Sequence, residues 1–113
     1  MNKVILVNAG RSKMNIYLIC NAGMSTSVLV KRMRQAALEK GIDVHVEAFS
    51  VEVLDQVKDQ ADVVLVGPQI RHMLSEIKLI VNEGCPVEMI SMSDYGLING
   101  KNVLERALEL LKK

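Results

Sequence analysis

The chain has 113 residues, of which half are hydrophobic and 24% are charged, a composition that favours one globular domain with a buried core. Lysine and arginine total 14 against 13 for aspartate and glutamate. This near balance gives no electrostatic basis for binding nucleic acid or an anionic membrane. The apolar runs are far shorter than the roughly 20 residues that a membrane-spanning helix needs. We therefore expect a soluble, cytoplasmic protein with no direct membrane insertion.

The first thirteen residues carry an apolar run, VILVNAG, and then a polar link. The run echoes YLICNAG at residues 17–23, but seven residues are too few to establish a repeat. It is also too short for the apolar region of a secretory signal. We predict that residues 1–13 are an extension or tag-like segment and that residues 14–113 form the domain. The alternative is an added edge strand.

A buried strand, a turn of small residues and a helix are predicted next. Residues 16–19 are aliphatic and β-branched, as in the middle of a parallel sheet, and the run stops at Cys20. Residues 21–23 permit a tight turn, and the hydroxyls of residues 25–27 can cap a helix that runs to about Lys40. The Cys20 thiol should therefore lie at the carboxyl edge of the sheet, facing the start of a helix.

This position predicts a reactive thiol. Backbone N–H groups of residues 22–27 would surround a point just beyond the sulfur of Cys20, as in a phosphate or thiolate site. The helix N-terminus should also lower the thiol pKa, which favours the nucleophilic thiolate. The alternative is that Cys20 is a buried structural residue, which is the commonest role for a free cysteine. Gly23 and three consecutive hydroxyls argue against it. Cys85 is expected to be a loop or core thiol, and both cysteines should stay reduced.

The rest of the chain alternates strands with helices. An edge strand is expected at residues 44–49, and a short helix packs inward with residues 53, 54 and 57. A central strand follows at 63–66, then one helix from Pro68 up to Gly84. The last elements are a strand at 87–90, a loop at 91–100 and a helix with an inward stripe at Val103, Leu104, Ala107, Leu108 and Leu111.

This alternation predicts an α/β domain of three layers, with a four-stranded parallel sheet between helices on both faces. We expect the strand order 2-1-3-4. In that order the crossovers leave strand one in opposite directions, so a crevice opens at its carboxyl end. Cys20 would lie there. Gln69, after the third strand, and Asp94 and Tyr95, after the fourth, would form the other walls.

Three segments resemble the lactose/cellobiose-type IIB component of the bacterial sugar phosphotransferase system: ICNAGMSTSVLVKRM at residues 19–33, ADVVLVGPQI at 61–70 and SDYG at 93–96. The resemblance implies a phosphocysteine at Cys20. It would be loaded by a phosphohistidine of the IIA component and unloaded to a sugar bound by the membrane component IIC. The sugar would be a β-linked disaccharide such as cellobiose or chitobiose. Gln69 and Tyr95 would border the site, and the implied phosphate-binding residues are Asn21, Ala22, Gly23, Met24, Ser25, Thr26 and Ser27.

Two other functions remain open. Low-molecular-weight tyrosine phosphatases have a similar fold and a C-x5-R-[ST] loop, but Thr26 occupies the arginine position. A hydroxyl cannot hydrogen-bond to two phosphoryl oxygens at once as a guanidinium does, so a phosphoryl group on Cys20 should be hydrolysed slowly. Asp94 is a poor candidate for a phosphatase-like general acid, because such loop aspartates usually cap or turn. A flavodoxin-like FMN or phosphate-binding module is disfavoured by an aromatic content of only 3%.

No metal or cofactor is expected. His45 and His72 fall on different predicted elements, and no histidine or cysteine pair has the spacing of metal ligands. We expect both histidines on the surface.

Overall fold

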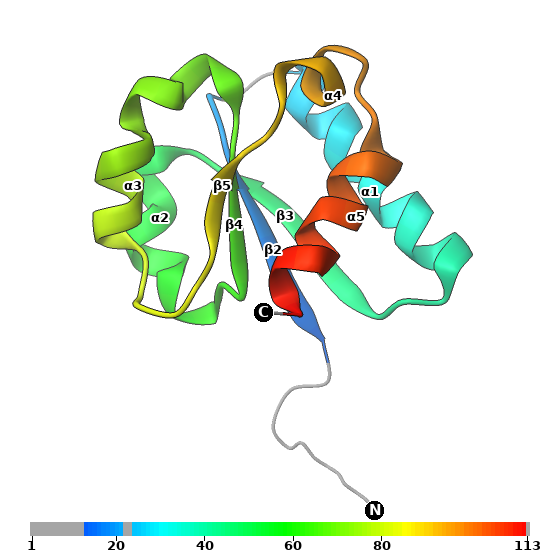
Figure 1. Cartoon of the computed structure of the whole chain (residues 1–113), viewed down its shortest axis with the longest axis horizontal. Coiled ribbons are helices and arrows are strands. Elements are labelled where there is room, and N and C mark those ends of the chain that lie inside the picture. Colours follow the sequence, from blue (N-terminus) through cyan, green and yellow to red (C-terminus); the bar gives the residue numbers. More distant parts are fainter. Residues whose placement is uncertain (1–12, 22–23, 113) are drawn as a thin grey trace, which may run out of the picture.

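Four parallel strands form the central sheet of the computed structural model, which describes residues 13–21 and 24–112 (Figure 1). The strands are β2 (Met14–Ile19), β3 (Val44–Phe49), β4 (Val63–Val66) and β5 (Val87–Met89). Their order across the sheet is β3-β2-β4-β5, which confirms the predicted order 2-1-3-4. The predicted extension lies outside the described residues except for Lys13.

The burial of each strand follows its sequence pattern. All of β4 is buried, as is β2 from Ile16 onwards, because these two continuous apolar runs are covered on both faces. The edge strand β3 has Val46 as its one buried residue. Ile19 is in register with Phe49 on one side and with Val66 on the other, so β2, β3 and β4 end together.

Helices cover both faces of the sheet. In Figure 1, α1 (Met24–Lys40) and α5 (Gly100–Leu111) lie on one side, and α2 (Val51–Val57) and α3 (Leu74–Ile80) lie on the other. Alternate residues of β2 point to opposite layers, so Leu18 packs in the α1/α5 core and Ile19 in the α2/α3 core. The fold is the expected three-layer α/β arrangement.

The first helix begins earlier than predicted. It starts at Met24, so Ser25, Thr26 and Ser27 lie within its first turn instead of capping it. Thr26 consequently turns inward, and it is 4% exposed, while Ser25 and Ser27 are exposed. A period of 3.6 residues on a helix explains why one hydroxyl of three consecutive ones is buried.

The segment after β4 also differs from the prediction of one long helix. A 3-10 segment, η2 (Pro68–Met73), precedes α3, and Ile70 within it has non-helical φ and ψ of −116° and 30°. Ile70 is 2% exposed in the α2/α3 core, so its burial accompanies the kink. The predicted helix reached Gly84, but α3 ends at Ile80 and Val81 is extended.

Smaller differences occur near the C-terminus and after α2. The predicted loop at 91–100 contains a short helix, α4 (Met92–Gly96), capped by Ser91, whose side chain accepts a hydrogen bond from the Asp94 N–H. Strand β5 ends at Met89, although Ile90 is buried beyond it. A 3-10 turn, η1 (Lys58–Gln60), follows α2. On α5 the buried stripe includes Leu110, whereas Leu108 and Leu111 are partly buried.

Candidate functional site

Cys20 lies at the carboxyl end of the sheet, directly after β2. Its N–H donates to the Phe49 carbonyl oxygen at the end of β3 (3.1 Å), and the Gly67 N–H, after β4, donates to the Ile19 carbonyl (2.9 Å). These two bonds hold the ends of three strands together. The Cys20 side chain is 3% exposed. The thiol is therefore fixed in a constrained position among three strand ends.

A cavity of about 180 Å³ adjoins the thiol. One water molecule needs only about 15 Å³ of such volume, so the space is large enough for an anion of several atoms. Hydroxyl side chains form much of its wall. The lining residues are Cys20, Asn21, Thr26, Ser27, Ala48, Phe49 and Ser50. The hydrophobic core thus covers only part of the Cys20 surroundings.

Ser50 is a lining residue that the sequence reasoning missed. It follows β3, just as Cys20 follows β2 and Gly67 follows β4. Because the carboxyl ends of neighbouring parallel strands meet at one edge of a sheet, the residue after β3 was a candidate from the predicted strand alone. Ser50 is the third hydroxyl-bearing residue in the lining of the cavity, and its side chain also hydrogen-bonds to Glu52.

Thr26 links the thiol to a distant part of the chain. Its side chain hydrogen-bonds to Cys20, and its Oγ1 lies 2.9 Å from the hydroxyl oxygen of Tyr95, which comes from α4. Tyr95 also packs against the α1/α5 core through its ring. The structure therefore brings Cys20, Thr26 and Tyr95 into one hydrogen-bonded row.

Gly67 and Gln69 approach the thiol from the loop after β4. A Cβ atom on Gly67 would lie 2.9 Å from the Cys20 Sγ and 2.9 Å from the Gln69 Oε1. Cβ atoms do not approach other atoms that closely, so any larger residue here would force the Cys20 and Gln69 side chains to move. The amide of Gln69 and the sulfur of Cys20 therefore border the same small volume.

Burial dominates the electrostatics of the thiol. It raises the pKa of Cys20 above its ordinary value, while hydrogen bonds from the Thr26 side chain and the Gly67 backbone act in the opposite direction and are weaker. The prediction of a lowered pKa is therefore wrong. Removal of the charged form from water outweighs the nearby donors, because the sulfur lies among closely packed strand ends. The resting side chain is a neutral thiol at neutral pH.

The described residues do not cover the whole predicted loop. Ala22 and Gly23 lie outside them, so the phosphate contacts expected from these two residues stay a prediction. Met24 is the first residue of α1. Asn21, Thr26 and Ser27 line the cavity, whereas Ser25 is exposed and does not line it.

A mostly apolar groove of about 270 Å³ lies beside the site. Gln69 and Tyr95 both line it, together with Pro68, Arg71, Met92 and Gly96. It connects the loop after β4 with α4. Gln69 and Tyr95 are not among the residues that line the cavity beside Cys20, so they share this neighbouring groove instead, and Tyr95 reaches Thr26 from there.

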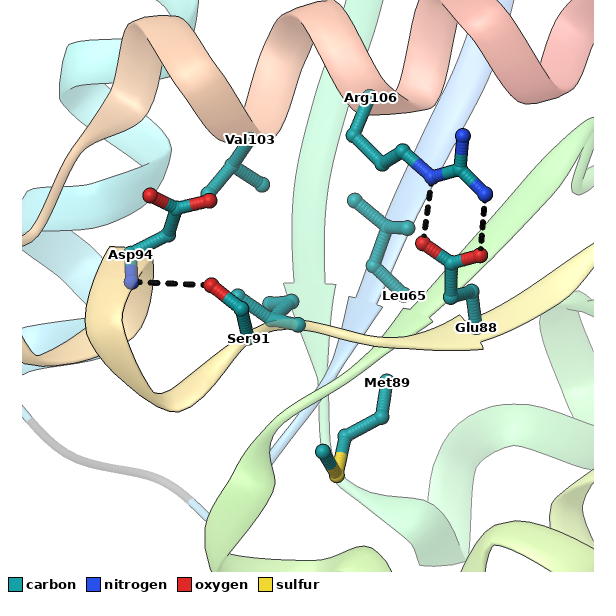
Figure 2. Close-up of a pocket in the computed structure, with 8 residues that line it drawn as sticks. Leu65, Glu88, Met89, Ser91, Asp94, Val103 and Arg106 are labelled. Atoms are coloured by element: carbon teal, nitrogen blue, oxygen red, sulfur yellow. Dashed lines mark hydrogen bonds and ion pairs between the residues drawn. The ribbon is translucent and has the colours of Figure 1, made fainter.

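Asp94 belongs to a different cavity, of about 200 Å³, between β5 and α5 (Figure 2). Glu88 and Arg106 form a two-point ion pair at its wall, with N–O distances of 2.6 and 2.7 Å. The carboxylate of Asp94 accepts from the Asn102 side chain at 3.2 Å. Asp94 is not among the residues that line the cavity beside Cys20, so the expectation that it forms a wall there is wrong. Its place at the start of α4 turns it towards α5.

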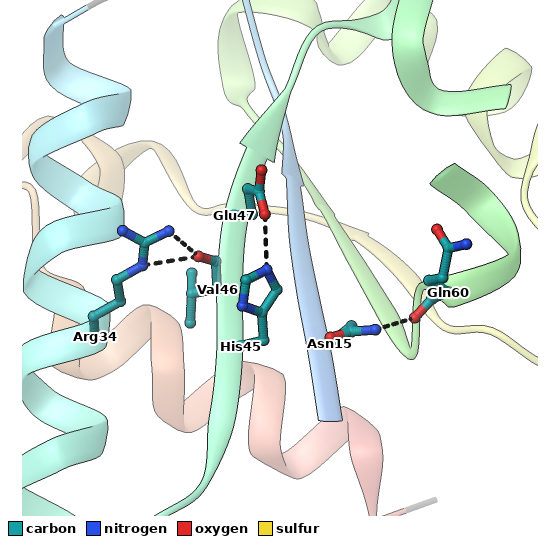
Figure 3. A network of polar contacts seen from close by, with 6 residues as sticks. All are labelled: Asn15, Arg34, His45, Val46, Glu47 and Gln60. Atoms are coloured by element: carbon teal, nitrogen blue, oxygen red, sulfur yellow. Dashed lines mark hydrogen bonds and ion pairs between the residues drawn. The ribbon is translucent and has the colours of Figure 1, made fainter. Parts of the chain in front are cut away.

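The two histidines take no part in the cavity beside Cys20. His45 lies on β3, where its Nε2 is 2.7 Å from the Glu47 carboxylate (Figure 3). Arg34 of α1 donates two hydrogen bonds to the Val46 carbonyl on the same strand. His72 is exposed on η2. Within residues 13–21 and 24–112, no group of three His, Cys, Asp or Glu residues could hold a metal ion.

None of the helices in the described part of the chain is long and apolar enough to cross a bilayer.

Known proteins resemble the chain over most of its length. Residues 15–106 match the family model for the "PTS system, Lactose/Cellobiose specific IIB subunit", where PTS denotes the phosphotransferase system. The PTS system galactose-specific EIIB component of Lactococcus lactis subsp. cremoris is 40% identical over 102 residues, covering 85% of this chain and 94% of that protein. The solution structure of a cellobiose-specific phosphotransferase IIB component from Borrelia burgdorferi is 41% identical, with a TM-score of 0.76 over 89% of this chain and 94% of that chain.

A more distant likeness concerns the fold alone. The crystal structure of a YwlE mutant from Bacillus subtilis is 16% identical, with a TM-score of 0.50 over 88% of this chain and 95% of that chain. Its fold is of the low-molecular-weight tyrosine phosphatase type, as predicted for this chain. The family match and the two relatives at about 40% identity carry more weight. The chain belongs to the lactose/cellobiose-specific IIB subunits of the phosphotransferase system, which are sugar phosphotransferases.

Proposed function

We propose that Cys20 is the phosphoryl carrier of this IIB component. The observation that carries the proposal is the thiol at the carboxyl end of β2, with a cavity beside it whose lining includes three hydroxyl-bearing residues, Thr26, Ser27 and Ser50. Hydroxyl donors bind phosphoryl oxygens, and the N-terminal end of α1 adds a favourable field for a negative group. The remaining phosphate contacts would come from Asn21 and the backbone of residues 22–25.

The proposed loading step is an in-line displacement. The Cys20 sulfur attacks the phosphorus of a phosphohistidine on IIA, so an S–P bond forms as the N–P bond breaks. The thiol proton ends on the imidazole nitrogen that leaves. Burial keeps Cys20 protonated at rest. The proton therefore has a destination in the same step, and no metal or cofactor is required. In the unloading step, a sugar hydroxyl bound by IIC attacks the phosphorus, so an O–P bond forms as the S–P bond breaks. The hydroxyl proton ends on the Cys20 sulfur that leaves, which restores the neutral thiol.

A carrier must hold its phosphoryl group long enough for the second partner to arrive. In the phosphatase loop an arginine stands at the position of Thr26, where its guanidinium stabilises charge during attack by water. Here Thr26 is buried and engaged with Tyr95. This arrangement supports binding of the phosphoryl group with slow hydrolysis.

The surface next to the site suits docking of the two partner proteins, IIA and IIC. Met92 and Leu97, at either end of α4, are 64% and 70% exposed. They lie near the groove that Gln69 and Tyr95 line. Exposed apolar side chains close to a reactive group favour contact with another protein. We expect this docking to take place in the cytoplasm. We expect no nucleic-acid partner.

We further propose a β-linked disaccharide, such as cellobiose or chitobiose, as the transported sugar. Relatives at 40% and 41% identity are named for galactose and for cellobiose, respectively. Sugar selection would rest with IIC, since this chain offers the sulfur and its cavity to a sugar that IIC already holds.

The test compares Cys20→Ser with the matched control Cys85→Ser. Each variant is incubated with a phosphorylated IIA component of the family, and its intact mass is measured. We expect the wild type and Cys85→Ser to gain the mass of one phosphoryl group and Cys20→Ser to gain none. Equal phosphorylation of both variants, or loss only in Cys85→Ser, would overturn the assignment. Circular dichroism shows whether each variant is folded.

A further inference from the structure

The hydroxyl of Thr26 contacts two groups but has one proton. Its Oγ1 lies 2.9 Å from the hydroxyl oxygen of Tyr95, and either oxygen can be the donor in that bond. Its side chain also hydrogen-bonds to Cys20. A thiolate can only accept. When Cys20 is ionised, Thr26 must give its proton to the sulfur, so Tyr95 must donate to Thr26.

The neutral thiol reverses this order. The S–H group then donates to Thr26, and Thr26 can donate to Tyr95. Ionisation of Cys20 therefore reverses the bond between Cys20 and Thr26, and it fixes Tyr95 as the donor to Thr26. The direction that serves the thiolate depends on Tyr95, because without a donor behind it the Thr26 hydroxyl is a weaker and less oriented donor.

We propose that Tyr95 is a positioning residue that orients the Thr26 hydroxyl towards the Cys20 sulfur and so favours its charged state. Among the described residues, Thr26 is the one polar residue that is buried, with 4% of its surface exposed. Water therefore does not readily replace Tyr95 as the hydrogen-bond partner of Thr26. Tyr95 is held by α4, where its N–H donates to the Ser91 carbonyl at 3.0 Å. The role of this row in phosphoryl transfer rests on the proposed function of Cys20.

The hydrogen-bonded row of Cys20, Thr26 and Tyr95 affects the charged state of the sulfur because the sulfur is buried. Desolvation disfavours the thiolate, and only a few donors reach Cys20 to offset it. Thr26 is one of them. A residue that keeps Thr26 pointing at the sulfur therefore influences reactivity without touching the reacting atoms.

The experiment measures alkylation of Cys20 by iodoacetamide as a function of pH, in a Cys85→Ser background so that one thiol reacts. We expect Tyr95→Phe to lower the rate at pH 7 by about twofold to tenfold, the range of one ordinary hydrogen bond between neutral groups, because Tyr95 bonds to Thr26 and not to the sulfur. The rate at high pH, where the thiol is fully ionised, should match that of the parent. This pattern identifies a shift in thiol pKa, which a change in access to the sulfur would not produce.

The double variant decides whether Tyr95 acts through Thr26. Thr26→Val should slow alkylation at pH 7 at least as much as Tyr95→Phe, and Tyr95→Phe should add nothing in the Thr26→Val background. Thr26→Ser, which keeps the hydroxyl, should keep the sensitivity to Tyr95→Phe. Additive losses in the double variant would overturn the inference. An unshifted pH profile in Tyr95→Phe, or a lower rate at every pH, would do the same.

These measurements need no phosphoryl donor. If Cys20 fails to accept a phosphoryl group while Tyr95→Phe still shifts its alkylation profile, the proposed function falls and the positioning role remains. If phosphorylation succeeds and the profile does not shift, the positioning role falls alone.

Discussion

The two cysteines lie at opposite edges of the same sheet, and their surroundings differ in chemistry. Cys20 follows β2 at the carboxyl edge, where hydrogen bonding to the Thr26 side chain and the Gly67 backbone lowers the thiol pKa, although burial outweighs both. Cys85 precedes β5 at the amino edge, near the Asp62 carboxylate. Its thiol donates weakly to the Pro86 carbonyl, at 3.8 Å. Donors favour a thiolate, whereas a carboxylate and an acceptor favour a thiol.

Burial alone does not distinguish the two sites. Desolvation raises the pKa of both thiols, and for Cys85 it acts together with the charge of Asp62 to give a pKa of about 11. The difference lies in what opposes desolvation. At Cys20 neighbouring donors oppose it, and at Cys85 a negative charge adds to it. In this fold the carboxyl edge of the sheet is therefore the edge suited to an anionic sulfur or a phosphoryl group.

Gly67→Ala should have the largest effect on the contrast between the two cysteines, because it disturbs the surroundings of Cys20. The new Cβ would lie 2.9 Å from both the Cys20 Sγ and the Gln69 Oε1, so the sulfur must move. Misplacement of a reacting atom by about 1 Å can slow a reaction about a hundredfold. We expect phosphorylation of Cys20 to fall by at least about tenfold, while overpacking lowers the free energy of unfolding by about 1–3 kcal/mol.

Intact mass after reaction with phosphorylated IIA and urea unfolding measure these two effects. Gly96→Ala is the matched control for stability, because a Cβ on Gly96 meets no heavy atom within 4 Å. Its free energy of unfolding should stay close to that of the wild type. Normal phosphorylation of Gly67→Ala would show that the position of the sulfur tolerates the added methyl group.

Asp62→Asn should have a smaller effect, on the other thiol. Removal of the carboxylate charge lowers the pKa of Cys85, so its alkylation at pH 8 should rise severalfold. An asparagine keeps a side-chain oxygen, which can still accept the hydrogen bond from the Asn15 N–H that Asp62 accepts at 2.7 Å. Peptide mass spectrometry resolves the two cysteines, and Cys20 in the same sample is the internal control. An unchanged rate for Cys85 would mean that desolvation alone determines its pKa.

The strands and their order were predictable because they depend on local patterns. The apolar runs of β2 and β4 are continuous, the run of β3 alternates, and right-handed crossovers leave few ways to connect them. These features predicted the sheet and put Cys20 at its carboxyl edge. Helix boundaries were less predictable, since the kink at Ile70 accompanies packing against distant residues.

The electrostatics of the site could not be predicted from local sequence. The position of Cys20 before a helix was visible in the sequence, but the burial that raises its pKa depends on how the ends of β3 and β4 meet around the sulfur. The contact between Thr26 and Tyr95 joins residues 69 positions apart. Asp94 and Tyr95 were both expected beside Cys20 because they follow the fourth strand, yet on α4 they line different cavities.

The smallest expected effect is on stability at alkaline pH. The pKa of Cys85 is raised from an ordinary value of 9.0 to about 11 in the folded state, so the folded state retains a proton that the unfolded state loses. The resulting stabilisation is complete below pH 9 and disappears as pH rises through 11. We expect Cys85→Ser to lose less stability than the wild type between pH 9 and 11. The difference should be about 1 kcal/mol or less, because the thiol is only half-buried and solvent screens it.

Urea unfolding of both proteins at pH 8, 9, 10 and 11 measures this difference, and the ionisation of lysine and tyrosine cancels because both chains share it. Parallel pH profiles would show that Cys85 loses its proton equally easily in the folded and unfolded states, and the contrast between the two edges would then rest on Cys20 alone.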